Sequence, residues 1–213
     1  MSDFAFNTIQ HFDDHISGSI NGYLLLDSLV LSLASFWAKD GESITDLGCT
    51  SGRLIHKIKA QYPHSNCIGY DITANNFLQG GASLTVQDIT DKGFEMPKSN
   101  LILCIFTLQF LSFENRQKLI KNMHSALNDN GALIIAEKEI SANGVIQEAF
   151  TFANYDYKKR GFTADQILEK ERTLRKIMNS LPDGKNKTLL EHAGFECFQF
   201  FQSLNFKGWV CLK

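Results

Sequence analysis

The stretch SITDLGCTSG, residues 43–52, decides the fold that we expect for this chain. Ser43 to Leu47 reads as a short buried strand, and the glycines that follow it indicate a tight turn. Apolar residues from Leu54 to Ile58 then recur at helical spacing, before Pro63 ends the helix. A strand, a glycine turn and a helix in this order are typical of a sheet that helices cover.

The same alternation continues further along the chain. Residues 66–71 and 83–87 each predict a strand, with a brief helical turn over residues 74–78 between them. Residues 100–106 are apolar without alternation, which is typical of a central parallel strand with helices on both faces. The segment from 43 to 106 therefore predicts a parallel α/β sheet.

The segments on either side predict more helices. Upstream, residues 22–38 place apolar side chains at steps of three and four. Downstream, Ser112 is expected to cap a helix that stops at residues 128–131. A strand follows over residues 132–137, and residues 145–160 predict another helix.

The C-terminal part ends in a predicted hairpin. Thr163 and Gln166 form a capping box that opens a helix expected to run to Pro182. After a short helix closed by Gly194, two strands joined by a tight turn complete the chain. We therefore expect an α/β fold, a three-layer Rossmann-like sandwich whose mostly parallel seven-stranded sheet ends in an antiparallel hairpin.

Composition and charge argue against several classes of protein. The 21 lysines and arginines stand against 23 aspartates and glutamates, so the net charge of −2 provides no global attraction to nucleic acid or anionic lipid. Five cysteines without a C-x-x-C pair favour reduced thiols over a disulfide framework or a zinc site. No segment reads as a signal peptide or a membrane span, so we expect a cytoplasmic protein. We also expect that it binds no metal ion.

Three aspartates follow successive predicted strands. Asp46, Asp71 and Asp88 end the first, second and third, and the carboxyl ends of parallel strands meet where open sheets bind ligands. Asp71 follows Gly48 at close to the spacing of roughly 20 residues at which an acid accepts ribose hydroxyls. Asp88 could accept from an adenine amino group while Ile89 packs on the base. Three such aspartates favour a ligand site over their common role in turns.

The glycine-containing turn fits the same ligand. Gly48 would let the backbone approach it closely, and Gly52 would let the next helix start near the sheet. Thr50 stands where a strict G-x-G-x-x-G motif has its middle glycine, so this motif alone is weak. Cys49 reads as a small packing residue rather than a reactive thiol.

Together these motifs resemble the class I S-adenosylmethionine-dependent methyltransferases. Within that superfamily the sequence is most similar to the carboxy-S-adenosylmethionine synthases, enzymes of tRNA wobble-uridine modification, from about Phe12 to the C-terminus. The segments that carry the resemblance are Asp46–Gly52, Tyr70–Asp71, Gln87–Ile89, Phe106–Leu111, Gly131–Leu133 and Glu137–Lys138.

The resemblance implies S-adenosylmethionine as the cofactor. It implies that Tyr23 contacts this molecule, that Gly48 and Cys49 line its methionine part, and that Asp71 holds its ribose. The expected cofactor-binding residues are Tyr23, Asp46, Gly48, Cys49, Thr50, Gly52, Asp71, Ile72, Asp88, Ile89 and Ile105. We expect a single domain over residues 1–213, with an N-terminal helical cap (1–40), a cofactor-binding half (41–137) and a helical substrate side with the C-terminal hairpin (138–213).

The acceptor side departs from the synthases. Where they carry an arginine that grips the added carboxylate, this sequence has Glu171, with Arg172 beside it. A negative charge would repel a carboxylated cofactor, and a slip of one residue turns a helical side chain by about 100°. Ile105 and Gly18 likewise replace an asparagine and an arginine of the synthases. These departures favour ordinary methyl transfer.

A universal catalytic residue is not expected, because the sulfonium already activates the methyl group and catalysis is mostly alignment. Candidates for taking a proton are His11, His15, Tyr23, Glu137 and Tyr155, and the candidates for the substrate side are His11, His15, Tyr155, Glu171 and Arg172.

We therefore expect a methyltransferase that acts on a small-molecule acceptor and does not bind nucleic acid or membrane directly; a homodimer is compatible with this interpretation. The alternative is a carboxy-S-adenosylmethionine synthase that uses prephenate as carboxyl source. The third hypothesis is a module that binds adenosylmethionine without catalysis.

Overall fold

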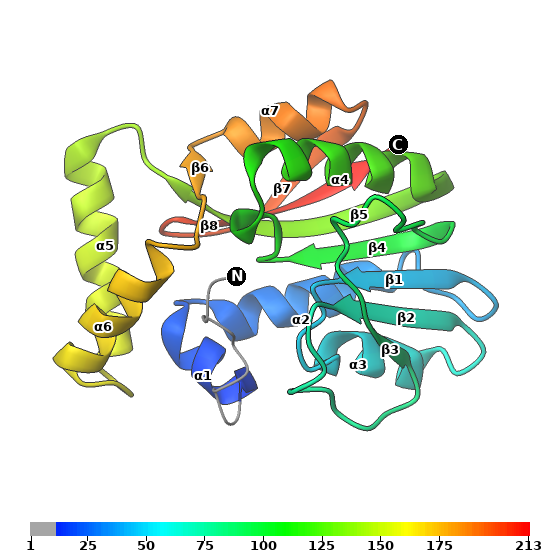
Figure 1. Ribbon diagram of the computed structural model, residues 1–213, viewed down its shortest axis with the longest axis horizontal. Helices are drawn as coiled ribbons and strands as arrows, with labels where there is room; N and C mark the ends of the chain where they lie inside the picture. Colours follow the sequence, from blue (N-terminus) through cyan, green and yellow to red (C-terminus); the bar gives the residue numbers. More distant parts are fainter. Residues whose placement is uncertain (1–11) are drawn as a thin grey trace.

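The computed structural model describes residues 12–213, which form a central sheet with helices on both faces (Figure 1). The strands are β1 (Ser43–Leu47), β2 (Asn66–Asp71), β3 (Ser83–Val86), β4 (Ser99–Ile105), β5 (Leu127–Ile140), β6 (Leu181–Pro182), β7 (Glu196–Ser203) and β8 (Phe206–Leu212). The helices are α1 (Phe12–Ser19), α2 (Tyr23–Ala34), α3 (Arg53–Gln61), the 3₁₀-helix η2 (Leu108–Phe110), α4 (Phe113–Ala126), α5 (Gly144–Lys158), α6 (Ala164–Leu174) and α7 (Lys185–His192).

The sheet has the expected topology. Its strand order is β3-β2-β1-β4-β5-β8-β7, in which β1 to β5 run parallel and β8 and β7 are antiparallel. The two-residue β6 pairs with β5 off this path. The seven-stranded prediction is therefore confirmed, with one short additional strand.

The central strand β4 explains the three layers. Leu101 and Leu103 point into a core shared with α2 and α3, whereas Ile102 and Cys104 point into a second core shared with α4 and α7. All four are completely buried. An apolar run without alternation thus corresponds to burial on both faces, as predicted. In Figure 1, α5 and α6 lie beyond one end of the sheet rather than over a face of it.

The prediction of a helical turn between β2 and β3 is wrong. Residues 72–82 contain bends and a turn but no helix. The amide of Asn75 donates to the Thr73 hydroxyl at 3.1 Å, a local bond of the kind that competes with helix formation.

The predicted extent of α6 is also wrong, although its capping box of Thr163 and Gln166 is confirmed. The helix ends at Leu174, well before Pro182. Beyond it, the Asn179 amide donates to the carbonyl of Gln109 at 2.6 Å, and the Asn179 carbonyl accepts from Arg116 at 2.6 Å. These long-range bonds hold the segment in a non-helical path.

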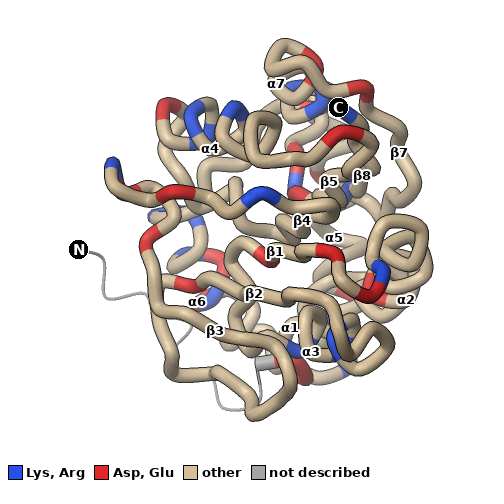
Figure 2. The backbone as a smooth tube through the Cα atoms, turned by 90° about the vertical axis from the view of Figure 1, so that its right-hand side faces the viewer, with Lys and Arg blue, Asp and Glu red and all other residues tan. Residues whose placement is uncertain are grey.

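Charged residues of both signs are interspersed along the backbone (Figure 2). Within residues 12–213, no single helix has the length and apolar character needed to cross a membrane; α1 and α2, bent by 113° at their junction, meet that criterion only as a pair.

Candidate functional site

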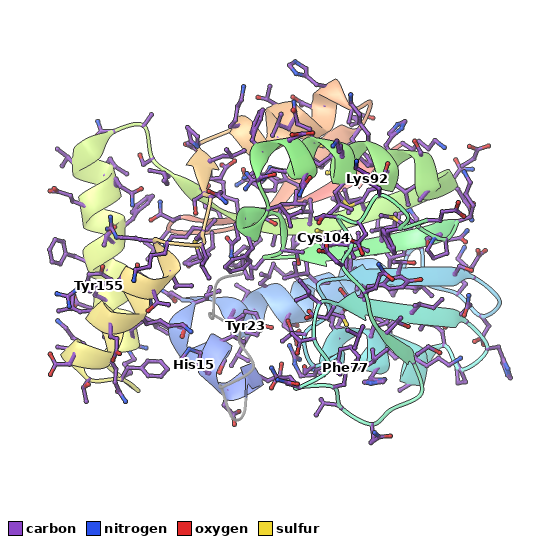
Figure 3. The ribbon with its side chains drawn as sticks, viewed as in Figure 1. His15, Tyr23, Phe77, Lys92, Cys104 and Tyr155 are labelled. Carbon is purple, nitrogen blue, oxygen red and sulfur yellow. The ribbon has the colours of Figure 1, made fainter. Side chains whose placement is uncertain are left out.

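A cavity of about 410 Å³ opens at the carboxyl ends of the parallel strands, within the roughly 300–1,000 Å³ typical of small-molecule pockets. The ends of β1, β2 and β4 form one wall, and residues of α1, α2, α5 and α6 contribute to the others. Figure 3 labels His15 on α1 and Tyr23 on α2, which lie to the left of β1 and β2 in this view.

The three strand-end aspartates line this one cavity, because the strands are in register. Leu47 pairs with Tyr70, and Asp71 pairs with Val86, so that successive strands end at the same edge. Of the expected cofactor-binding set, these residues line the cavity: Tyr23, Asp46, Gly48, Cys49, Thr50, Asp71, Ile72, Asp88, Ile89 and Ile105.

Gly52 does not line the cavity. It has a left-handed backbone with φ of 73°, and a Cβ atom there would lie 2.5 Å from the Leu84 side chain. The glycine is thus required by the packing of α3 on the sheet. At Gly48, a Cβ atom would lie 2.3 Å from the Thr107 hydroxyl, so this glycine is required by a protein contact as well as by its φ of 72°.

Asp71 ties the end of β2 to the glycine loop. Its Oδ2 accepts from the Thr50 amide at 2.9 Å, and its Oδ1 accepts from the Thr73 amide at 3.2 Å. Burial raises the pKa of Asp71, although these backbone donors act in the opposite direction. The loop and this carboxylate are therefore held in one arrangement before any ligand binds.

Asp46 is almost completely buried, with 3% of its surface exposed. Burial and the nearby charge of Asp71 raise its pKa to about 7, with Arg53 opposing them. A ligand cation close to Asp46 would favour the ionised carboxylate.

Asp88 has both a local role and a place at the cavity. Its Oδ1 accepts from the amide of Thr90 at 2.8 Å and from the hydroxyl of Thr90 at 2.7 Å. This is the turn-forming role that aspartate commonly has after a strand. Ile89 beside it is buried and apolar, as a surface for packing against a flat ring requires.

Two cavity residues have left-handed backbones that side chains with a Cβ rarely adopt. Thr50, at the position of the missing glycine, has φ of 50°, and Phe106 after β4 has φ of 57°. Such conformations cost about 1–3 kcal/mol each and cluster at functional sites. The sequence contains no signal for the strain at Phe106.

Sequence reasoning also missed Arg53, the first residue of α3. Its guanidinium donates to Asp13 at 3.0 Å, to Asp27 at 2.6 and 2.9 Å, and to the Tyr23 hydroxyl at 3.3 Å. Ser51 also donates to Asp13. These bonds anchor α1 and α2 beside the glycine loop, so Tyr23 reaches the cavity through contacts that only the fold creates.

Only some of the residues predicted for the acceptor side line the cavity. His15 and Glu171 line the cavity, whereas Tyr155 and Arg172 do not; His11 lies outside the described residues. Tyr155 lies on α5 (Figure 3), with its ring 5.8 Å from the Lys158 ammonium.

Glu137 is excluded from the cavity and has a structural role. Its carboxylate accepts from the amides of Thr107, Leu108 and Gln109 at 3.1, 2.7 and 2.8 Å, which caps η2. Burial raises its pKa to about 8 despite Arg116 and these backbone donors. The hypothesis that Glu137 takes a proton from the acceptor is therefore not supported by its position.

All five cysteines are buried and free. At Cys49, burial and the charges of Asp46 and Asp71 raise the pKa of the thiol. A thiol in this environment is not a nucleophile, which agrees with the packing role predicted for it.

Three lysines at the acceptor side were not among the predicted site residues. Lys138 on β5, Lys158 on α5 and Lys170 on α6 all line the cavity together with Glu171. Lys158 and Glu171 form an ion pair at 2.6 Å. Although burial opposes it, this contact and the neighbouring cations lower the pKa of Glu171, which favours its ionised carboxylate.

Comparison with known proteins agrees with this fold. Residues 45–133 match the family model described as a methyltransferase domain. Carboxy-S-adenosyl-L-methionine synthase from Staphylococcus epidermidis is 27% identical, over 97% of this chain and 94% of the relative. The synthase from Methylococcus capsulatus is 29% identical, over 100% and 95%. The solved plantazolicin methyltransferase BpumL has a TM-score of 0.65 at 15% identity, over 94% of this chain and 87% of that one.

The chain is thus an S-adenosylmethionine-dependent transferase, and its residues 45–133 match a methyltransferase domain. S-adenosylmethionine is the cosubstrate that this class implies. More particularly, the chain is similar over nearly its whole length to curated carboxy-S-adenosyl-L-methionine synthases.

Proposed function

We propose that this protein transfers the methyl group of S-adenosylmethionine to a small-molecule acceptor. The observation that carries the proposal is that Asp46, Asp71 and Asp88 line one cavity with the glycine loop, and that this cavity continues to the side chains of α5 and α6. One ligand-sized space therefore joins an adenosyl-compatible half to a second half where an acceptor fits.

The residues on the sheet side fit S-adenosylmethionine. Asp71, Asp88 and Ile89 line the cavity; Asp71 would accept from the ribose hydroxyls, and Asp88 with Ile89 would hold the adenine. Asp46 and the loop from Gly48 to Thr50 would take the methionine part, with the negative charge of Asp46 near its cationic groups. Bound in this way, the sulfonium supplies an activated methyl group, and the chain's contribution is to orient the acceptor in line with it.

His15 is the side chain best suited to accept a proton from the acceptor. It lines the cavity, and burial together with Lys170 and Lys158 lowers its pKa, which favours the neutral imidazole near neutral pH.

The second candidate is carboxy-S-adenosylmethionine synthesis. It is supported by the name of the full-length relatives and by the lysines at the acceptor side. It is opposed by Glu171, whose carboxylate lies at the cavity where the resemblance implies an arginine.

Mass spectrometry of the nucleoside product distinguishes the two. Purified protein is incubated with S-adenosylmethionine and prephenate, and separately with S-adenosylmethionine and a panel of small acceptors. We expect S-adenosylhomocysteine to form only with an acceptor and no carboxylated nucleoside to form with prephenate. A carboxylated product would overturn the methyltransferase proposal. Tight binding of S-adenosylmethionine without turnover in either arm would instead support a non-catalytic binding module.

The Glu171→Arg variant provides a matched comparison. If the α6 position faces the transferred group, this change should raise the affinity for a carboxylated cofactor, because a guanidinium pairs bidentately with a carboxylate. No gain in affinity would mean that residue 171 does not reach that group.

A further inference from the structure

Lys138 is a largely buried ammonium that lines the cavity and forms no ion pair within the described residues, although the charge of Glu171 acts on it. It follows Glu137 on β5, and within residues 12–213 its Nζ has no ion-pair or hydrogen-bond partner; its nearest described contact is the ring of Phe206, with the ammonium 5.8 Å from the ring centroid. Burial lowers its pKa. Leaving an ammonium partly desolvated and unpaired is costly, so the position favours a ligand that brings a negative charge.

The surrounding wall has the same sign. Lys158 and Lys170 line the cavity with Lys138, and Glu171 is the acidic residue among them. The single carboxylate of Glu171 is already paired with Lys158 at 2.6 Å. Lys138 and Lys158 thus share one carboxylate, which leaves an excess of positive charge on this side.

The opposite wall is acidic, so the two halves of the cavity differ in the sign of their charge. Asp13, Asp27, Asp46, Asp71 and Asp88 line that wall, and Arg53 is the basic residue there. A cationic cosubstrate is therefore favoured near the strand ends, and an anion near the helices α5 and α6.

We propose that the acceptor carries a carboxylate or a phosphate, and that Lys138 pairs with this anionic group. The inference rests on the proposed function, because it assigns the second half of the same cavity to the acceptor. Lys138 would be a specificity-determining residue that orients the acceptor.

Calorimetric titration at pH 7 tests this proposal on the full chain saturated with S-adenosylhomocysteine. The probes are benzoate, phenyl phosphate and the uncharged benzamide. We expect one of the two anions to bind about tenfold or more tightly than benzamide, because a charge-assisted hydrogen bond forms only with the anion. Which anion binds more tightly separates a carboxylate acceptor from a phosphate acceptor.

Two variants identify the residue. Lys138→Met should reduce the preference for the anion to within about twofold, while the affinity for S-adenosylhomocysteine stays unchanged. Lys159→Met is the matched control, because Lys159 is exposed, directly follows α5 and pairs with Asp156 at 3.0 Å; it should keep the preference.

Three results would overturn the inference. The first is wild-type protein that binds the anions no better than benzamide. This measurement tests the inference even if the Lys138→Met variant fails to fold. The second is a Lys138→Met variant that keeps the preference. The third is a Lys138→Met variant that loses affinity for S-adenosylhomocysteine, since Lys138 would then hold the methionine carboxylate. Wild-type protein that binds no S-adenosylhomocysteine would refute the proposed function itself, and the inference with it.

Discussion

At the scale of single residues, Asp46 links the charge of the site to pH. Its carboxyl group is buried beside Asp71, so its pKa rises from the ordinary 3.8 to about 7. Below that pH the unliganded site holds a neutral acid, and above it a carboxylate. A cationic ligand binds the carboxylate better and so lowers this pKa, which couples ligand binding to the release of a proton.

We predict that the affinity for S-adenosylmethionine rises between pH 6 and pH 8. Because one proton is released on binding, the gain is at most about tenfold per pH unit below the pKa and levels off above it. Calorimetry at both pH values measures the gain. Asp46→Asn should bind more weakly and show a flatter profile; an unchanged profile in this variant would assign the pH dependence to another group.

At the scale of secondary-structure elements, the contacts of Arg53 connect α3 to α1 and α2. The Asp27 side chain, 11% exposed, accepts from Arg53 and from Lys57, which is 46% exposed. Although burial alone would raise the pKa of Asp27, these cations hold it below its usual value. The N-terminal helices are thus attached to the cavity wall through two carboxylates, Asp13 on α1 and Asp27 on α2.

We predict that Arg53→Met lowers the free energy of unfolding by about 2 kcal/mol, because it leaves Asp13 without its charged partner and Asp27 with only the exposed Lys57. Lys57→Met is the control on the same carboxylate, and its loss should stay below about 1 kcal/mol because that pair is exposed. Urea unfolding measures both. Equal losses in the two variants would show that the Arg53 contacts add no more stability than a surface ion pair.

At the scale of the whole molecule, the cavity is enclosed by segments far apart in the chain. Residues from Asp13 to Arg53 and from Lys138 to Met178 line it on different sides. A ligand that contacts both sets stabilises their arrangement in the folded state and has no such site in the unfolded chain.

We predict that S-adenosylhomocysteine at 100 times its Kd stabilises the protein by about 2.7 kcal/mol and raises Tm by roughly 5–10 °C. Asp71→Ala, examined at the same ligand concentration, should lose much of this shift, because it removes charge-assisted bonds expected to the ribose and weakens binding by about 1–3 kcal/mol. A scanning thermal unfolding experiment measures both shifts. An equal shift in the variant would refute the role assigned to Asp71.

The sequence alone determined which segments form the strands of the main sheet, including the bounds of β1 and β2. It also determined the capping box of α6 and the convergence of the three aspartates. Periodicity, helix caps and strand-end positions are local patterns, so the sequence shows them directly. The tertiary structure alone decided where α6 ends, that Arg53 anchors the N-terminal helices, and that Lys138, Lys158 and Lys170 meet at one cavity. Those features depend on contacts between residues far apart in the chain, and such contacts leave no periodic signal in the sequence.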